Sequence, residues 1–299
     1  MGYMLTKNRN YTEPKTAIDA GLDSDALFEP KITGTILPNG TVSDKSFTVY
    51  REYEDGEQVV LNSGVKEGYY AGSYKTLLDT AEALFPNSVT NMQTWDNGAL
   101  LVFTQDIDDQ FTFGDGDSFT KHIMYTASLN STLTTKAIGF TFRPFCTNQE
   151  GQGTLQLAQK RTRNHDGLLF SKAKVMAKYA DAFDRFIANA TLLKGLEMTN
   201  QLRNSILAEV APLIHDPEAN TKAINAAEKR RDGIMYYYEE EANTFGHNAF
   251  SLYQAVQSYE FHVGTKGKST EIKKVNVVSD PTRAQSLTLQ TGRMLLAVA

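Results

Sequence analysis

The sequence contains little cysteine and histidine, and this shortage excludes several kinds of site. A single cysteine, Cys146, cannot form a disulfide within the chain and cannot build a zinc site made only of thiolates. The five histidines lie far apart and lack the short spacings of zinc motifs. We therefore expect no metal, no cofactor and a reducing compartment, the cytoplasm.

The chain also lacks long apolar runs and the signatures of common catalytic sites. No run approaches the ~20 apolar residues of a membrane span, and the first residues lack the charged-then-apolar order of a signal peptide. There is no nucleophile elbow, no Walker-type phosphate loop, no H-E-x-x-H helix and no G-x-G-x-x-G after a strand. These absences predict a protein that does not enter a membrane and is not an enzyme.

What the chain does have is an uneven distribution of charge. Its net charge is −5, but the segment Lys160–Arg185 carries seven basic and three acidic residues, so that segment is +4 and the rest is −9. Clustered lysine and arginine bind the phosphate backbone of nucleic acids. The same segment is also compatible with the solvated face of a helix in a protein whose acids lie elsewhere. Both interpretations stay open at this point.

The pattern of apolar residues predicts mainly strands in the first half of the chain. A helix at Thr16–Leu27 precedes a β-hairpin at Phe47–Val65, which turns at Glu54-Asp55-Gly56. A second helix has Ser73 as its N-cap and ends at Pro86. Four strands then follow, at Val89–Thr94, Ala99–Asp106, Lys121–Leu129 and Leu133–Cys146.

From Leu155 onward the apolar spacing predicts helices for about a hundred residues. Because strands do not alternate with helices, we expect an α+β fold with an antiparallel sheet, a β-hairpin and helices on one side, followed by a mostly helical C-terminal half. The predicted parts are a flexible N-terminus at 1–15, one α+β domain at 16–263 that is sheet-rich over 30–148 and helical over 155–263, and a C-terminal tail at 264–299.

An acidic group near the middle of the chain admits two interpretations. Its carboxylates could hold a hard cation, but their spacing differs from an EF-hand loop, and a hairpin connection rich in turn-forming residues explains them better. Cys146 could act as a nucleophile with His122 or His165 as its base, but a lone cysteine at a strand end is more often a small buried residue. The acidic group consists of Asp106, Asp108, Asp109, Asp115 and Asp117.

Aromatic and basic residues gather on or beside the predicted sheet. Single-stranded nucleic acid is held by a positive groove that follows the phosphates and by flat side chains that stack on bases. This composition allows such a groove, although aromatics are also common in sheets for packing reasons alone. The residues concerned are Tyr50, Arg51, Tyr53, Lys66, Tyr69, Tyr70, Tyr74, Lys75, Lys121, Tyr125, Lys136 and Arg143.

The junction after the last predicted strand resembles a known family. The strand ends in Arg143, Pro144, Cys146 and Asn148, and the basic segment after it contains Arg163-Asn164-His165-Asp166-Gly167. This order resembles the R-V-x-C-x-N strand end and the R-H-T-x-G-like segment of the DUF932 family of phage- and plasmid-encoded proteins. Further segments are similar to the same family in the same order, over roughly residues 16 to 262. They are Ala17–Asp23 with Leu27 and Pro30, Val49–Phe85, Gly114–Asp117 with Ile123–Ser131, and Asn243–His262, in which Phe245, Gly246, Asn248 and Ala249 take the places of the family's W-G-x-x-N-A.

The order of hairpin, strands and following helix is also similar to the core of Rad52-like single-strand annealing proteins. Those proteins form rings or filaments and hold DNA between a β-hairpin and a basic, helix-bearing core. The resemblance implies a phage or plasmid protein that binds and anneals single-stranded DNA in recombination or replication, as a homo-oligomer in the host cell cytoplasm. The alternative is a non-enzymatic factor that binds a host or phage protein through its acidic helical half.

By this resemblance the hairpin and the basic segment form the two walls of a DNA groove. Cations in both walls would neutralise phosphates, and tyrosines near them would stack on bases. The implied cations are Arg51, Lys66, Lys121, Lys136, Arg143, Lys160, Arg161, Arg163, Lys172, Lys174 and Lys178, and the implied tyrosines are Tyr50, Tyr69, Tyr70 and Tyr125.

Overall fold

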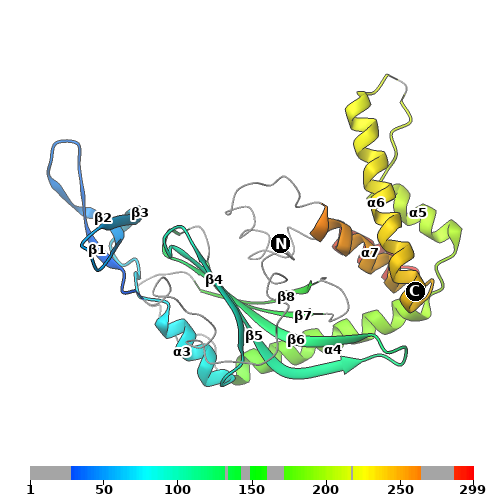
Figure 1. Ribbon diagram of the computed structural model, residues 1–299, viewed down its shortest axis with the longest axis horizontal. Coiled ribbons are helices and arrows are strands. Elements are labelled where there is room, and N and C mark those ends of the chain that lie inside the picture. The colour runs from blue at the N-terminus through cyan, green and yellow to red at the C-terminus, as the bar shows by residue number, and fades with distance from the viewer. Residues whose placement is uncertain (1–27, 132–133, 143–148, 160–171, 217, 264–285) are drawn as a thin grey trace.

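The computed structural model describes residues 28–131, 134–142, 149–159, 172–216, 218–263 and 286–299. Within these ranges the chain forms two antiparallel sheets and a set of helices, which confirms the α+β class expected from the sequence. Figure 1 shows the smaller sheet at one end of the molecule, the larger sheet in the middle and helices α5, α6 and α7 at the other end. The predicted helix at Thr16–Leu27 lies outside the described residues.

The smaller sheet, called the outer sheet below, has three strands in the order β1-β2-β3. Strands β2 and β3 form the predicted hairpin, and the backbone N–H of Tyr53 donates to the carbonyl of Glu57 at 2.8 Å to close its turn. Gly56 in that turn has a φ of 87°, a left-handed conformation that glycine adopts without steric cost. The strands are β1 (Lys31–Ile36), β2 (Val42–Glu52) and β3 (Gln58–Lys66).

The larger sheet, called the central sheet below, is an antiparallel meander of five strands in the order β4-β5-β6-β7-β8. Each strand pairs with the next one along the chain, so no crossover connection is needed. The strands are β4 (Val89–Trp95), β5 (Leu100–Thr112), β6 (Ser118–Ser128), β7 (Thr135–Phe142) and β8 (Gln149–Gln159).

Two boundaries differ from the sequence prediction. The helical half was expected from Leu155, but this residue lies in β8, where Leu157 pairs with Ala137 of β7. Leu155 and Leu157 alternate with polar residues, which is the period of a strand, and the next helix among the described residues begins at Lys172. Strand β5 also runs past the expected end at Asp106, so three of the five acidic residues lie within the strand and not in its turn.

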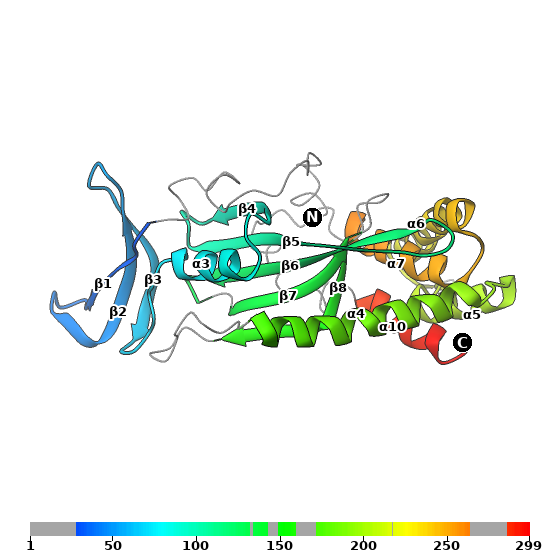
Figure 2. The ribbon, with the colours of Figure 1, turned by 90° about the horizontal axis from the view of Figure 1, so that it is seen from below.

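Helices cover one face of the central sheet. The N-cap of α3 is Tyr74 and not the predicted Ser73, and the buried Tyr74 hydroxyl donates to the carbonyl of Ala99 at 2.8 Å. Figure 2 shows α3 and α4 lying across the same side of the sheet. The helices are α3 (Lys75–Leu84), α4 (Lys172–Gly195), α5 (Asn200–Val210), α6 (Thr221–Phe245), α7 (Ala249–His262) and α10 (Ser286–Leu296).

The core lies between this face and the helices. Phe119, Ile123 and Tyr125 alternate along β6, and all three side chains point into the core, where Phe119 packs edge-on against Phe186 of α4. We call this side of the central sheet the helix face. The opposite face of β6 is also buried and carries Met124 and other residues of even number.

The outer sheet is attached to the central sheet through polar contacts. The Arg51 guanidinium donates to the carbonyl of Asn97 at 3.2 Å, and the Asn62 amide donates to the carbonyl of Leu129 at 3.0 Å. These contacts fix one face of the outer sheet against the turns of the central sheet. The opposite face of the outer sheet points away from the central sheet.

The C-terminal helix α10 packs on α7 of the same chain. The Glu260 carboxylate of α7 accepts hydrogen bonds from the N–H groups of Leu287 and Thr288 at 2.9 and 2.8 Å, which caps the first turn of α10. A Cβ on Gly292 would approach the Tyr253 ring to 3.1 Å, so glycine allows this close contact. The end of the predicted C-terminal tail is therefore a docked helix.

Candidate nucleic-acid interface

One face of the outer sheet carries an exposed set of lysine, tyrosine and hydroxyl side chains. Strand register places Tyr50 opposite Lys31 of β1 and Val60 of β3, and Lys66 opposite Ser46. Directly paired residues of antiparallel strands share a face, so these five side chains lie on the same side. We call this side the lysine face.

The lysine face is largely exposed. Lys31 and Lys66 are exposed, Val60 is 62% exposed and Tyr50 is half-buried. The Lys31 Nζ lies 2.5 Å from a carboxylate oxygen of Glu52 on the same face. Side-chain hydroxyls join the strands between these residues, at Thr35–Thr48 (3.1 Å) and Ser46–Thr35 (3.2 Å).

Arg51, which was expected to bind phosphate, lies on the face turned towards the central sheet. Its side chain is 4% exposed, it donates to the Asn97 carbonyl, and its guanidinium carbon lies 4.1 Å from the centre of the Tyr53 ring. Because neighbouring residues of a strand point to opposite faces, Tyr50 and Arg51 cannot lie on one binding surface. Arg51 therefore attaches the outer sheet and is not part of the lysine face.

The other predicted tyrosines are held by the body of the protein. The Tyr69 hydroxyl donates to the carbonyl of Leu129 at 2.8 Å, and Tyr70 is half-buried. Tyr125 is completely buried on the helix face, where its ring stacks on Phe103 at 4.6 Å. The expectation that Tyr125 stacks on a base is therefore wrong, because no base can reach a ring in the core.

The two predicted lysines of the central sheet lie on opposite faces. Lys121 is on the helix face with its Nζ 3.9 Å from the centre of the Phe183 ring of α4. Lys136 of β7 pairs with Thr126 of β6 and so shares its face. Thr126 and Lys121 are an odd number of residues apart on β6 and therefore point to opposite faces. Because side chains alternate along a strand, these two cations cannot contact one phosphate chain on a single sheet face.

The basic segment is only partly placed. Arg143, Lys160, Arg161 and Arg163 lie outside the described residues. The remaining predicted cations of this segment begin α4, and the structure describes their backbone only; they are Lys172, Lys174 and Lys178.

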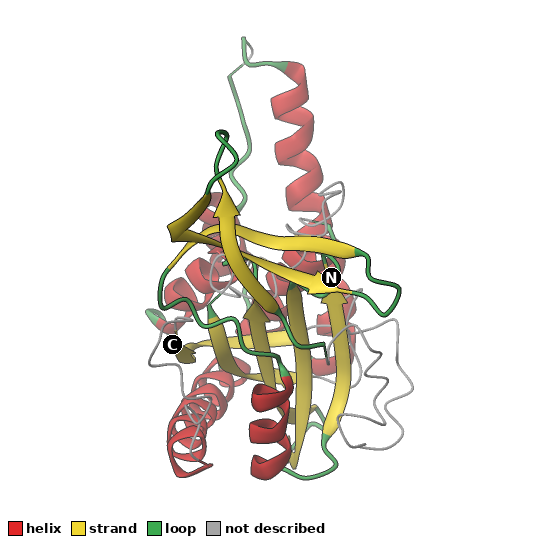
Figure 3. Cartoon of the chain, turned by 90° about the vertical axis from the view of Figure 1, so that its left-hand side faces the viewer, coloured by secondary structure: helices red, strands yellow, loops and turns green. Residues whose placement is uncertain are grey.

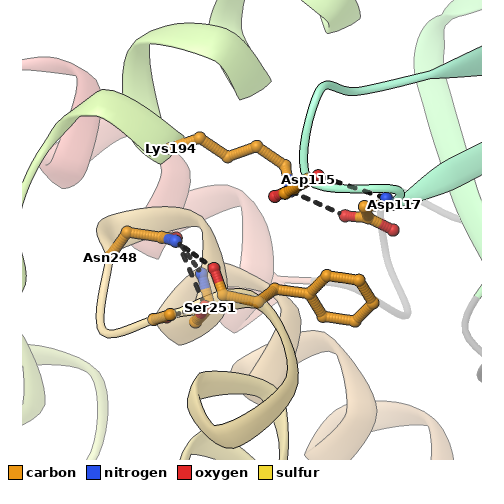
Figure 4. Close-up of polar contacts among 7 residues, drawn as sticks. Asp115, Asp117, Lys194, Asn248 and Ser251 are labelled. Carbon is orange, nitrogen blue, oxygen red and sulfur yellow. Dashed lines mark hydrogen bonds and ion pairs between the residues drawn. The ribbon is translucent and has the colours of Figure 1, made fainter.

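A partly buried charge cluster joins distant segments at the opposite end of the central sheet from the outer sheet. The Lys194 Nζ at the end of α4 lies 2.6 Å from Asp115 and 2.9 Å from Asp117, both in the β5–β6 turn (Figure 4). The Lys194 and Asp117 side chains are 11% and 0% exposed. Among the described residues, no three carboxylate, imidazole or thiol groups converge as a metal site. The turn interpretation of these two aspartates thus agrees with the structure, with lysine as their counter-ion.

Aromatic rings and hydrogen bonds surround this cluster. The Lys194 Nζ lies 4.7 Å from the ring centre of Phe113, 5.2 Å from that of Phe250 and 5.3 Å from that of Phe245. Burial alone would raise the pKa of Asp115, but hydrogen bonds from Lys194 and from the Asp117 N–H, with the lysine charge, hold it below its ordinary value. The cluster therefore connects β5–β6 to the helices through a buried Lys194–Asp117 pair, with Asp115, 36% exposed, at its outer edge.

The α6–α7 junction beside this cluster is held by a capping network. The Asn248 side-chain oxygen accepts from the Ser251 N–H at 2.9 Å, and the Ser251 hydroxyl donates to the Gly246 carbonyl at 2.7 Å (Figure 4). Gly246 has a φ of 90°, which favours glycine at this position. The sequence-predicted G-D-G-D turn and F-G-x-N-A helix start are thus brought close to each other by Lys194.

Lys194 was not singled out from the sequence, although a signal for it exists. Phe183, Phe186, Ala190 and Leu193 form the buried stripe of α4, and Lys194 follows Ala190 by four residues on the same side of the helix. A lysine that continues an apolar stripe requires a buried acid as its partner.

One buried histidine lies on the opposite face of the central sheet. The His122 Nε2 is 2.9 Å from the Thr120 hydroxyl, and His122 pairs across the strands with Asp106. Burial lowers the pKa of His122 to about 4, although the neighbouring Asp106 charge acts in the opposite direction. The imidazole is therefore neutral at pH 7 and part of the core.

Comparisons with known proteins identify the family without an activity. No curated protein and no solved structure matches the chain. No helix in the described ranges has both the length and the apolar character needed to cross a bilayer. A family model described as a domain of unknown function, DUF932, matches residues 73–293. The match starts after the outer sheet and ends within α10, so its limits differ from the expected 16 to 262. Because it covers well over half of the 299 residues, the chain belongs to the DUF932 family.

Proposed function

We propose that this protein binds and anneals single-stranded DNA in phage or plasmid recombination or replication, as a homo-oligomer and without catalysis. The observation that carries the proposal is the lysine face of the outer sheet. On one sheet face it combines an aromatic ring, Tyr50, with hydroxyls and, opposite Ser46 four residues away on β2, the exposed cation Lys66, which are the groups that hold a single strand. The proposed interface does not include three of the predicted residues, because their side chains make contacts within the protein. They are Arg51, Lys121 and Tyr125.

The local charges disfavour one end of the outer sheet for phosphate. Glu54, Asp55 and Glu57 are exposed at the β2–β3 turn, and their negative charges repel phosphate. Lys66 lies at the other end of the same hairpin. We therefore expect a bound phosphate chain to stay clear of this turn.

A strand held in this way would stay competent for pairing. Contacts to phosphates and stacking on one face of a base leave the hydrogen-bonding edges of the bases open. A second strand can then be tested against the first while the protein still holds it. This arrangement supports annealing in preference to mere protection of a single strand.

Fold-level similarity supports the same proposal by analogy. An antiparallel meander, β5–β8, is followed by the long helix α4 on one of its faces, and a separate β-hairpin precedes it. This order resembles the core of Rad52-like annealing proteins. The analogy adds a class of function and does not assign any residue.

Fluorescence anisotropy with a labelled oligonucleotide across a salt gradient tests the proposal. We expect micromolar or tighter binding that weakens as salt rises, and acceleration of pairing between complementary strands. Tyr50→Ala and Lys66→Gln should each weaken binding several-fold, whereas Lys75→Gln on α3 is the control, because Lys75 is neutralised by Asp79 one turn away. Absence of salt-sensitive binding at micromolar protein overturns the proposal.

A second candidate function is binding of a host or phage protein through the helical half. It is favoured by Tyr236 of α6, which is 60% exposed and hydrogen-bonded to the neighbouring Glu240 at 2.7 Å. Exposed tyrosines are frequent at protein interfaces. Native mass spectrometry separates the two functions, because annealing predicts a large homo-oligomer and the second candidate a defined complex with a different protein.

A further inference from the structure

The outer half of α6 extends away from the rest of the molecule. Figure 1 shows α6 rising above α5 and α7, and Figure 3, from a perpendicular direction, shows the same helix reaching beyond both sheets. Residues 221–230 are exposed except for two partly buried positions, whereas Ile234 and Tyr238 further along the helix are buried. The first half of α6 thus contributes little to the core.

Three cations share one side of this exposed half. At about 100° per residue, Lys229 lies about 20° from Lys222 around the helix, and Arg230 lies about 80° from Lys222 on the other side. The three therefore fall within an arc of about 100° that also contains Ala226. All four residues are exposed. We call this surface the α6 basic face.

Neither pairing nor helix stability explains these charges. Within the described part of the chain, no ion pair involves Lys222, Lys229 or Arg230, whereas Lys194 and Lys31 have carboxylate partners. Lys222 lies in the first turn of α6, where a cation is disfavoured because the helix dipole is positive at that end. The charges therefore point to a partner outside the chain.

The shape of the face limits what that partner is. Ala226 adds little bulk between the cations, and Lys222 and Lys229 are about 10 Å apart along the axis. A row of cations over small side chains suits a chain of phosphates, whereas an interface with a protein usually depends on aromatic and apolar groups in its centre. On the α6 basic face, between Lys222 and Arg230, there is no aromatic or large apolar side chain.

We infer that the α6 basic face binds successive phosphates of a single DNA strand, as a second contact besides the lysine face of the outer sheet. The inference rests on the proposed function and extends it to a surface at the other end of the molecule. The lysines supply compact positive charges, and Arg230 supplies a planar group that can donate two hydrogen bonds to one phosphate.

The test compares two triple variants with the same loss of charge. K222Q/K229Q/R230Q removes the basic face. K75Q/R185Q/R293Q is the control, because Lys75 and Arg185 are each paired with an aspartate one turn away and the three exposed cations lie on different helices. Far-ultraviolet circular dichroism and thermal melting of both variants check that α6 still forms.

Binding of a fluorescent oligonucleotide is then measured from 50 to 200 mM salt. Each phosphate contact in a single strand contributes about 0.7 to the slope of log K against log salt, so the first variant should lose about 2 from the slope and the control about none. Over this fourfold range of salt the salt-induced loss of affinity should be about 15-fold smaller in the first variant than in the wild type. Affinity at 50 mM salt should fall as well.

Three results overturn the inference. The first is an unchanged slope in the K222Q/K229Q/R230Q variant, which would also be the result if the face bound a protein. The second is an equal loss in the control, which would assign the effect to net charge. The third is absence of binding by the wild type, and this result overturns the proposed function together with the inference, so the two failures are distinguishable.

Discussion

The two sheets of this protein use their side chains in opposite ways. The central sheet is buried on both faces of β6, where Phe119 and Met124 are 1% and 5% exposed although they point in opposite directions. The outer sheet leaves even its large apolar residues in contact with solvent, with Ile36 at 73% and Val42 at 65%. The first sheet is therefore a scaffold, whereas the second presents a surface.

The same chemistry has a different effect in the two regions. Lys31–Glu52 in the outer sheet and Lys194–Asp117 beside the central sheet are both lysine–carboxylate pairs, at 2.5 and 2.9 Å. The side chains of the first pair are 49% and 31% exposed, and those of the second are 11% and 0% exposed. Water screens the first pair, while the second pair is shielded, so removal of one partner costs far more in the second.

The largest expected effect follows from breaking the shielded pair. Lys194→Met keeps an unbranched apolar side chain, one atom shorter than lysine, but leaves the buried Asp117 carboxylate without its counter-ion. We expect a loss of about 3–5 kcal/mol in the free energy of unfolding, as is usual when one partner of a buried ion pair is removed. Equilibrium urea denaturation at pH 7, followed by circular dichroism, measures this loss.

A double variant provides the control for this prediction. Lys194→Met with Asp117→Asn removes the buried charge as well, so it should be more stable than Lys194→Met alone. If the single variant loses less than about 1 kcal/mol, the cluster is not the internal connection described above, and Lys194 becomes a candidate for a role at the surface.

A smaller effect should appear as a pH dependence of the central sheet. The folded-state pKa of His122 is about 4, against an ordinary value of 6.5, so the unfolded chain binds a proton more readily between these values. This contribution to stability is complete above pH 6.5 and is lost as the pH falls towards 4. The loss from this one group is on the order of 3 kcal/mol.

Urea denaturation at several pH values between 4 and 7 measures the effect. His122→Asn should flatten the slope of stability against pH in this window, whatever its effect on stability at pH 7. The exposed His215 offers the matched control, His215→Asn, which removes an imidazole outside the core. An unchanged slope in His122→Asn would mean that another group causes the acid sensitivity.

The sequence was a good guide to local structure and a poor guide to which surfaces meet. The β2–β3 hairpin was predicted because its turn residues and alternating pattern are encoded within a few neighbouring residues. Strand β8 was missed because only Leu155 and Leu157 mark its alternation. The predicted end of strand β5 at Asp106 was too early, because a run of acidic residues is typical of a turn. The sequence alone does not reveal that β5 continues to pair with β6 beyond this run.

The candidate site was harder to predict because it depends on register. Tyr125 has the composition of a base-stacking residue, but its position on β6 places it in the core. Tyr50 and Arg51 are neighbours in sequence and lie on opposite faces. Lys194 and Asp115 are 79 residues apart, so no local pattern could reveal their contact. The family resemblance, in contrast, was carried by the order of short motifs and did not require any of these contacts.

The smallest expected effect follows from breaking the exposed pair of the outer sheet. Lys31→Gln removes the partner of Glu52, but the Glu52 carboxylate keeps access to water and a hydrogen bond from Gln58 at 2.8 Å. We expect a change in melting temperature of less than about 1 °C, because exposed pairs are screened and their side chains lose entropy on pairing. A drop close to that of Lys194→Met would show that the outer sheet is part of the scaffold. If Lys31→Gln instead leaves stability unchanged but weakens binding of single-stranded DNA, the sheet has the role of a binding surface, since the same lysine would then act on a phosphate and not on the fold.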